Sequence, residues 1–189
     1  KKVNICLAGG VFANVKLNQK IREISNVKNV YIQPAMGDTG ISLGAIYAFL
    51  NKKKKIYPKF LSSVALGSEY KFKDVKNKID KNKFIFKKIK NIENILFDEF
   101  QKGKPVGLFT GKMEFGPRAL CQRSILYHAK DKTINDWLNK RLNRTEFMPF
   151  APVTIEDLTE KCFKNLNKND HSADFMTMTY DCTTKFIKN

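Results

Sequence analysis

The chain has 189 residues, 42% of them hydrophobic, which allows a buried core in one large or two small domains. Its net charge of +17 comes mostly from lysines scattered along the chain, a pattern typical of a solvated surface, so we do not expect a nucleic-acid partner. No apolar run is long enough to cross a membrane and no signal-peptide pattern opens the chain, so we expect a cytoplasmic protein without membrane contact.

The first 50 residues alternate between strand and helix patterns. Apolar runs at 3–8 and 30–32 predict strands, and apolar residues at helical spacing predict helices at 15–24 and 39–50. Asp38 or Thr39 can cap the second helix, and Cys6, within the first run, is expected to pack in the core. The order β-α-β-α predicts an α/β sheet.

Two loops at the ends of these strands can do chemistry. Gly9-Gly10, with Asn14 just beyond, can bring backbone N–H groups close to a phosphate, because glycine lets the chain approach without a Cβ. The same pair also fits a tight strand-to-helix connection, which is the commoner use. Asp38, between two glycines, is either a helix cap or one metal ligand, and a metal needs more ligands than this stretch offers.

A connector separates this segment from the rest. Residues 51–66 open with a lysine run, contain a proline and show no clear period, so we expect a linker to a second domain. In that domain the patterns predict strands at 84–86, 105–110, 151–155 and 175–180, and helices at 73–81, 91–100, 131–142 and 156–163. Asn91 and Asp131 can cap helices, Gly103 fits a helix end, and His171 is expected to face solvent.

Residues 111–126 read GKMEFGPRALCQRSIL and follow an apolar strand pattern. A stiff Gly/Pro turn there carries Arg118 and Arg123, and four of the five arginines of the chain lie between positions 118 and 144. Planar guanidinium groups bind oxyanions such as phosphate in a bidentate manner, so a phosphate site is expected here. Structural ion pairing is the alternative for both arginines, and Glu114 either orients these cations or pairs with one of them.

Several stretches resemble the O-carbamoyltransferases of the nodulation-factor and antibiotic-tailoring type. LAGGVFAN at 7–14 and IQPAMGDTGISLGA at 32–45 resemble the end of that family's actin-like ATPase domain. Residues 111–126 match the family's GRMEFGPRALGNRSIL almost letter for letter, and 144–152 resemble its REXFRPFAP. The resemblance covers most of the chain, which corresponds to a middle piece of a longer enzyme.

The resemblance implies an α/β fold in two parts. Residues 1–50 would be the C-terminal βαβα piece of an actin-like (ASKHA-type) ATPase domain, and 51–66 the linker. Residues 67–189 would form a truncated α+β YrdC-like domain with a twisted mixed sheet.

The resemblance also implies an ATP-dependent carbamoyltransferase. Such an enzyme forms carbamoyl-adenylate from carbamoyl phosphate and ATP, and then transfers the carbamoyl group to a hydroxyl of an acceptor such as a sugar. The catalytic candidates are Arg118, Arg123, Ser124 and Lys112. The nucleotide-binding candidates are Gly9, Gly10, Asn14, Gly116 and Arg144.

A divalent metal, iron or magnesium, is implied for the full-length enzyme, with Asp38 as one ligand. The other family ligands are two histidines of an HxxxH motif that nothing here matches, so we expect no assembled metal site in this chain. The oligomeric state stays open, with a dimer as one option.

Three of the departures from the family pattern bear on the site. Lys112 stands for an arginine. Cys121 replaces a glycine, which is tolerable only if that position does not need a positive φ. Met148 replaces an arginine that would be a second phosphate ligand, so either Arg144 or a lysine compensates, or carbamoyl phosphate is handled poorly, or the substrate differs.

Two other interpretations compete with the enzyme. One is an RNA-binding YrdC-like module related to tRNA threonylcarbamoylation. The other is a folded but inactive fragment. Arginines clustered on one turn favour a small-molecule phosphate, whereas arginines spread over a face favour RNA.

Overall fold

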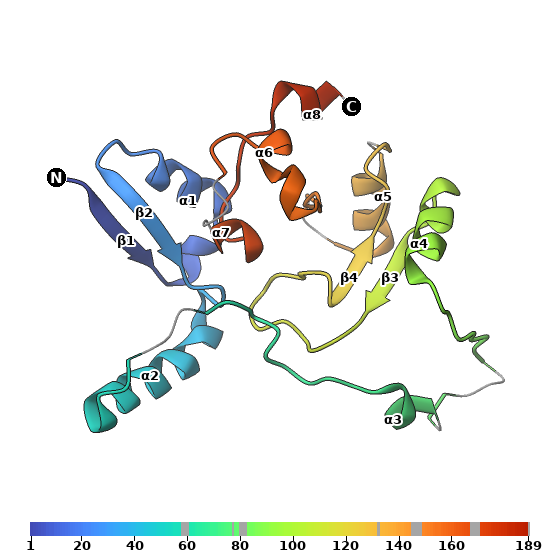
Figure 1. Cartoon of the computed structure of the whole chain (residues 1–189), viewed down its shortest axis with the longest axis horizontal. Helices are drawn as coiled ribbons and strands as arrows, with labels where there is room; N and C mark the ends of the chain where they lie inside the picture. The colour runs from blue at the N-terminus through green and yellow to red at the C-terminus, as the bar shows by residue number, and fades with distance from the viewer. Residues whose placement is uncertain are drawn as a thin grey trace.

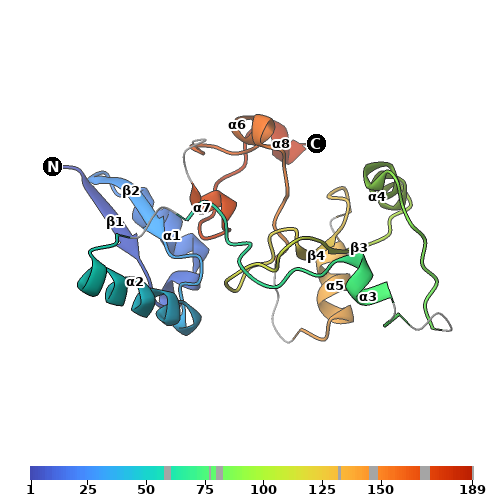
Figure 2. The ribbon, with the colours of Figure 1, turned by 60° about the horizontal axis from the view of Figure 1, so that its bottom comes forward.

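The computed structural model describes residues 1–57, 61–76, 78–79, 83–131, 133–144, 149–166 and 171–188. It has a mixed α/β architecture with two small sheets, one parallel and one antiparallel, each made of two strands. Figures 1 and 2 show an N-terminal unit and a second unit built around the other sheet, with the C-terminal segment running between them.

The N-terminal unit is a β-α-β crossover. Strands β1 (Val3–Leu7) and β2 (Val27–Ile32) pair in parallel, with Leu7 opposite Ile32, and helix α1 (Val15–Arg22) connects them. The 3-10 helix η1 (Gly10–Ala13) leads into α1. Asn14 caps α1, its Oδ1 accepting from the Leu17 N–H at 3.0 Å. The predicted β-α-β order is confirmed, but Cys6, which was expected in the core, is exposed.

Helix α2 (Ile41–Lys54) follows a one-turn 3-10 helix, η2 (Asp38–Gly40). The predicted cap by Asp38 or Thr39 is wrong: Gly40 is the N-cap and no side chain bonds there, because η2 already supplies the turn that enters the helix. Lysines occupy the last turn, where their positive charges interact favourably with the negative end of the helix dipole.

The second sheet pairs β3 (Val106–Phe109) with β4 (Arg123–Leu126) in antiparallel register, Phe109 opposite Arg123. Helix α4 (Ile92–Gln101) contacts β3 and begins as predicted at Asn91, whose Oδ1 accepts from the Asn94 N–H at 3.3 Å. Gly103 ends it with a φ of 66°, also as predicted.

The remaining helices are short. They are α3 (Phe72–Lys76), α5 (Ile134–Arg141), η3 (Glu156–Leu158), α6 (Thr159–Cys162), α7 (His171–Asp174) and α8 (Thr184–Lys188). Asp131 does not cap α5 directly. Its Oδ1 binds the N–H and hydroxyl of Thr133, which is the N-cap residue, at 2.9 and 2.7 Å.

Three predicted strands are wrong. Residues 84–86 and 151–155 belong to no strand within the described residues, and Ile85 is fully solvent-exposed. Residues 175–180 begin with a turn and also belong to no strand. The N–H groups of Met176 and Thr177 bond back to Ala173 and Ser172 to close α7, so they cannot enter a sheet ladder. The predicted helix at 73–81 ends as α3 at Lys76, and part of it lies outside the described residues.

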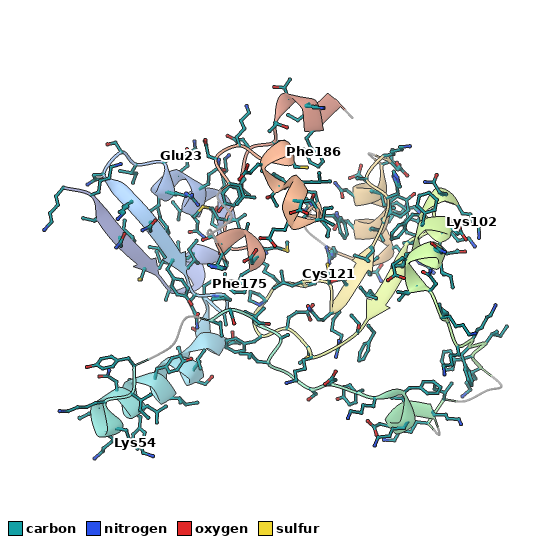
Figure 3. All side chains as sticks on the ribbon, viewed as in Figure 1. Glu23, Lys54, Lys102, Cys121, Phe175 and Phe186 are labelled. Carbon is teal, nitrogen blue, oxygen red and sulfur yellow. The ribbon has the colours of Figure 1, made fainter. Side chains whose placement is uncertain are left out.

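The core lies between β2 and the C-terminal segment. Ile32, Met36 and Met178 are buried together, and Leu7, Phe12, Val30 and Tyr180 pack against them. Figure 3 shows Phe175, at the end of α7, beside the N-terminal unit. Residues more than 140 positions apart therefore complete one apolar cluster, which ties the end of the chain to its beginning.

No helix within the described ranges is long and apolar enough to cross a membrane.

Candidate functional site

The site is built where the turn of residues 111–122 meets the loops that follow β1 and β2. The carboxyl ends of parallel strands lie at one edge of a sheet, so these two loops are neighbours, and the Gly9 N–H donates to Met36 O across them at 2.6 Å. Loops at that edge of α/β sheets are common ligand sites. Figure 1 shows the stretch between β3 and β4 reaching to the end of this strand pair.

Gly116 allows this close approach. Its φ of 112° is one that L side chains rarely adopt, and a Cβ there would lie 3.0 Å from Pro34 O. Glycine is thus required both for the backbone conformation and for the contact with the loop after β2.

Arg118 reaches from the same turn to the loop after β1. Its Nη2 donates to Ala13 O, the last residue of η1, at 2.8 Å. A charge-assisted bond of this length is among the stronger hydrogen bonds in proteins. It joins Arg118 to η1, the short helix that starts at Gly10 and ends beside Asn14, so stretches that the sequence suggested as separate sites are in contact.

The Nε of Arg118 is buried and has no hydrogen-bond partner within the described part of the chain. A buried donor without an acceptor costs about 1–3 kcal/mol, and most for charged groups. An acceptor oxygen that came within hydrogen-bond distance of Nε would recover that cost.

The glycine loop itself is open. Gly9 has a φ of 118°, and a Cβ placed on either Gly9 or Gly10 would meet no atom within 4 Å. Asn14 is exposed and already uses its Oδ1 to cap α1. The donors that this loop can offer to a ligand are therefore the Asn14 Nδ2 and backbone N–H groups other than that of Gly9, which already bonds to Met36 O.

Asp38 opens η2 close to this edge and is exposed. Within the residues that the structure describes, no three His, Cys, Asp or Glu side chains gather where they could hold a metal ion. One carboxylate does not fit a metal centre by itself, so no chemistry is assigned here to a metal.

Glu114 organises the turn. It is buried, and its Oε1 accepts from the backbone N–H groups of Leu120, Gln122 and Arg123 at 2.9, 2.8 and 3.1 Å. Burial taken alone would raise the pKa of Glu114, but these N–H donors outweigh it and lower the pKa. Glu114 was expected to orient Arg118 and Arg123 or to pair with one of them. Among the described residues it forms no ion pair with either side chain.

The Arg123 guanidinium is held by backbone carbonyls and an aromatic ring. Its Nη1 donates to Thr110 O and Gln122 O (2.6 and 2.9 Å), and its Nη2 donates to Ser68 O and Gly111 O (3.3 and 3.2 Å). The guanidinium also lies 3.6 Å from the centre of the Phe109 ring. These contacts brace the ends of β3 and β4.

Ser124 belongs to the same brace, because its Oγ accepts from the Cys121 N–H at 2.9 Å. Cys121, two residues before β4 (Figure 3), has a φ of 71°. A cysteine was expected to be tolerated here only if the position does not need a positive φ. The φ is positive, and the resulting backbone strain is about 1–2 kcal/mol. Burial, with the charge of Glu114 adding to it, raises the pKa of the thiol, which disfavours the thiolate.

Two further candidates lie apart from Arg118. Lys112 is exposed on the turn, and the Arg144 guanidinium lies 5.5 Å from the centre of the Phe150 ring. Met148 lies outside the described residues. Sequence reasoning missed Asn18, which is fully buried beside η1, although its position one helical turn after Asn14 on the inward face of α1 was a usable signal.

Comparisons with known proteins match both ends of the chain to two models. The description "Carbamoyltransferase N-terminus" matches residues 1–47, and "Carbamoyltransferase C-terminus" matches residues 98–189.

Individual relatives match over most of the chain. A Nodulation protein U of Azorhizobium caulinodans is 32% identical over 162 residues, covering 85% of this chain and 27% of the relative. An uncharacterized protein of Methanocaldococcus jannaschii is 35% identical over 177 residues, covering 89% of this chain and 29% of the relative. Nodulation protein NolO of Bradyrhizobium diazoefficiens is 29% identical over 166 residues, covering 85% of this chain and 30% of the relative. The chain thus spans less than a third of the length of each of these relatives.

Proposed function

Since this chain belongs to the carbamoyltransferase family, we propose that it carries part of an ATP-dependent carbamoyltransferase. That enzyme forms carbamoyl-adenylate from carbamoyl phosphate, ATP and water, with release of phosphate and pyrophosphate. It then passes the carbamoyl group to a hydroxyl of an acceptor such as a sugar, with release of AMP. Residues 1–50 are assigned to the end of an actin-like domain, 51–66 to a linker, and 67–189 to a YrdC-like domain.

The observation that carries the proposal is the bond from Arg118 Nη2 to Ala13 O. The bond joins a guanidinium to the segment that contains the glycine loop, and no atom lies within 4 Å of a Cβ built on Gly9 or Gly10. The buried Nε of Arg118 also lacks a hydrogen-bond acceptor among the described residues. Both features favour a phosphate-bearing ligand.

The charges of the substrates explain why such a site is useful. ATP and carbamoyl phosphate are both polyanions, so bringing them together costs electrostatic repulsion that a fixed guanidinium offsets. Catalysis then rests on positioning and charge neutralisation more than on a protein nucleophile. Arg118 is assigned the anion-binding role, and Gly9, Gly10, Asn14 and Gly116 are assigned to the walls of the nucleotide site.

The other candidates take supporting roles. Arg123 and Ser124 hold the turn in shape through their contacts with backbone groups. Lys112 and Arg144 are assigned to the outer part of the site as further cations. Asp38 is assigned as one metal ligand in the whole protein.

The test is product formation by the intact protein. Incubation with ATP and carbamoyl phosphate, followed by mass spectrometry of the nucleotides, should reveal carbamoyl-adenylate, and omission of carbamoyl phosphate should abolish it. Nucleotide recovered without carbamoyl-adenylate, from protein shown to be folded, contradicts the proposal.

A further inference from the structure

Asn18 links three parts of the chain from the buried side of α1. Its Nδ2 donates one hydrogen bond to Phe12 O in η1 and a second to Thr177 O in the segment after α7, each at 2.7 Å. Asn18 and Thr177 are both 0% exposed. An amide NH₂ has two hydrogens, so both are used.

Asn18 and Arg118 each hold one carbonyl of η1. Phe12 O accepts from Asn18, and the next carbonyl, Ala13 O, accepts from Arg118 at 2.8 Å. Because η1 connects Gly9 to Asn14, the two side chains that hold these carbonyls also hold the glycine loop.

Burial sets the cost of losing the Asn18 amide. Removing it leaves two carbonyl acceptors without their donor in a dry environment, where each unsatisfied group costs about 1–3 kcal/mol. A plainly structural role would be to fasten the segment after α7 to α1.

Thr179 already performs that structural role separately. Its Oγ1 lies 2.7 Å from Gln19 Oε1 and 3.3 Å from Val15 O, both in α1, and among the described residues it makes no hydrogen bond to η1. Asn18 and Thr179 therefore join the same two segments, but only Asn18 also holds the loop.

We propose that Asn18 is a positioning residue for the nucleotide loop: through Phe12 O it holds η1, and with it Gly9, Gly10 and Asn14, in the conformation that receives the phosphates of ATP. This inference rests on the proposed function, because ATP is the ligand assigned to that loop. Asn18 touches no ligand and acts through the backbone of η1.

The experiment compares Asn18→Leu, which keeps the volume and removes both donors, with Thr179→Val as the matched control. For each variant and the wild type, three quantities are measured: stability to urea, the Kd for ATP by calorimetry, and hydrogen exchange of the η1 amides without ligand. Both variants are expected to lose stability. Only Asn18→Leu is expected to raise the Kd by about tenfold, the equivalent of one buried hydrogen bond.

Hydrogen exchange reports on the loop directly. The N–H groups of Phe12 and Asn14 bond to Gly9 O and Val11 O within η1, so their exchange should accelerate in Asn18→Leu and stay at the wild-type rate in Thr179→Val. If Asn18→Leu does not fold, Asn18→Ser, which retains one hydroxyl donor, serves in its place.

Equal losses of ATP affinity in the two variants, or unchanged affinity in the Asn18 variant, overturn the positioning role. A wild-type protein that binds no ATP defeats the proposed function instead. In that case the exchange rates still decide the role of Asn18 in holding η1: faster exchange supports it and unchanged exchange overturns it.

Discussion

The Arg118 guanidinium bonds to the carbonyl of Ala13, 105 positions earlier in the chain, at 2.8 Å. This single contact joins the turn of residues 111–122 to the glycine loop after β1. Gly116 allows the turn to approach the loop after β2, and the space beside Gly9 and Gly10 is open. Five measurements test the account that follows from it.

Gly10→Ala should separate ligand binding from folding. A Cβ at Gly10 meets no protein atom within 4 Å, and the φ of this residue is not positive, so the free energy of unfolding should change by less than about 0.5 kcal/mol. The added methyl group would stand where a phosphate approaches the backbone, so the Kd for ATP should rise. Gly44→Ala, equally free of contacts but within α2, is the control and should leave the Kd unchanged. Wild-type ATP affinity in Gly10→Ala would remove this loop from the site.

Glu114→Gln should destabilise the turn and change its response to acid. The folded-state pKa of Glu114 lies below the usual value of 4.5, so its ionised form contributes stability that is present above that value and is lost as pH falls through the folded pKa. Urea unfolding should show a loss of about 1–3 kcal/mol at pH 7. The difference between wild type and variant should shrink as pH falls through the folded-state pKa, below 4.5, and a difference that is constant with pH would argue against an ionised Glu114.

Cys121 provides a test of backbone strain. Its φ is 71°, so Cys121→Gly should be more stable than Cys121→Ala by about 1 kcal/mol, because alanine keeps the Cβ and glycine does not. Both variants lack the thiol, which makes their difference a measure of the backbone alone. Thermal unfolding of the pair is sufficient, and an alanine variant of equal or greater stability would rule out the positive φ.

Arg123→Ala tests the brace at the ends of β3 and β4. Loss of the four carbonyl contacts and of the Phe109 ring contact should lower the free energy of unfolding by about 2 kcal/mol. The ATP affinity of the folded fraction should stay within threefold of wild type. Arg123→Lys should restore little stability, because an ammonium group cannot reach the same set of carbonyls. A stable Arg123→Ala that has lost ATP binding would return Arg123 to the ligand site.

Local patterns predicted the local structure well. Asn91 and Gly103 mark the two ends of α4 in the sequence as they do in the structure, and the apolar spacing around Val15 located α1. The alternation at 175–180 misled, because Met178 is buried against Ile32 by a turn and not by a strand. Apolar alternation indicates that alternate side chains are buried. It does not indicate whether the backbone N–H groups pair with a neighbouring strand.

The site was predicted in part for the same reason. The sequence identified Arg118 and the Gly9-Gly10 loop as separate phosphate sites, but it holds no local signal for a contact across 105 positions. Glu114 and Arg123 were assigned to each other or to ligand as charged groups. Their partners are backbone N–H and C=O groups, which are present at every residue and so leave no trace in a pattern of side chains.

The most direct test is the ATP affinity of Arg118→Ala, measured by isothermal titration calorimetry on protein whose fold is verified by circular dichroism. Arg141→Ala, which removes an exposed guanidinium from the last turn of α5, is the control for the loss of one positive charge. The account predicts that Arg118→Ala weakens ATP binding at least tenfold, as the loss of a charge-assisted contact would, while Arg141→Ala stays within twofold of wild type. Equal affinities in folded Arg118→Ala and wild type would contradict the assignment of this turn as the phosphate site.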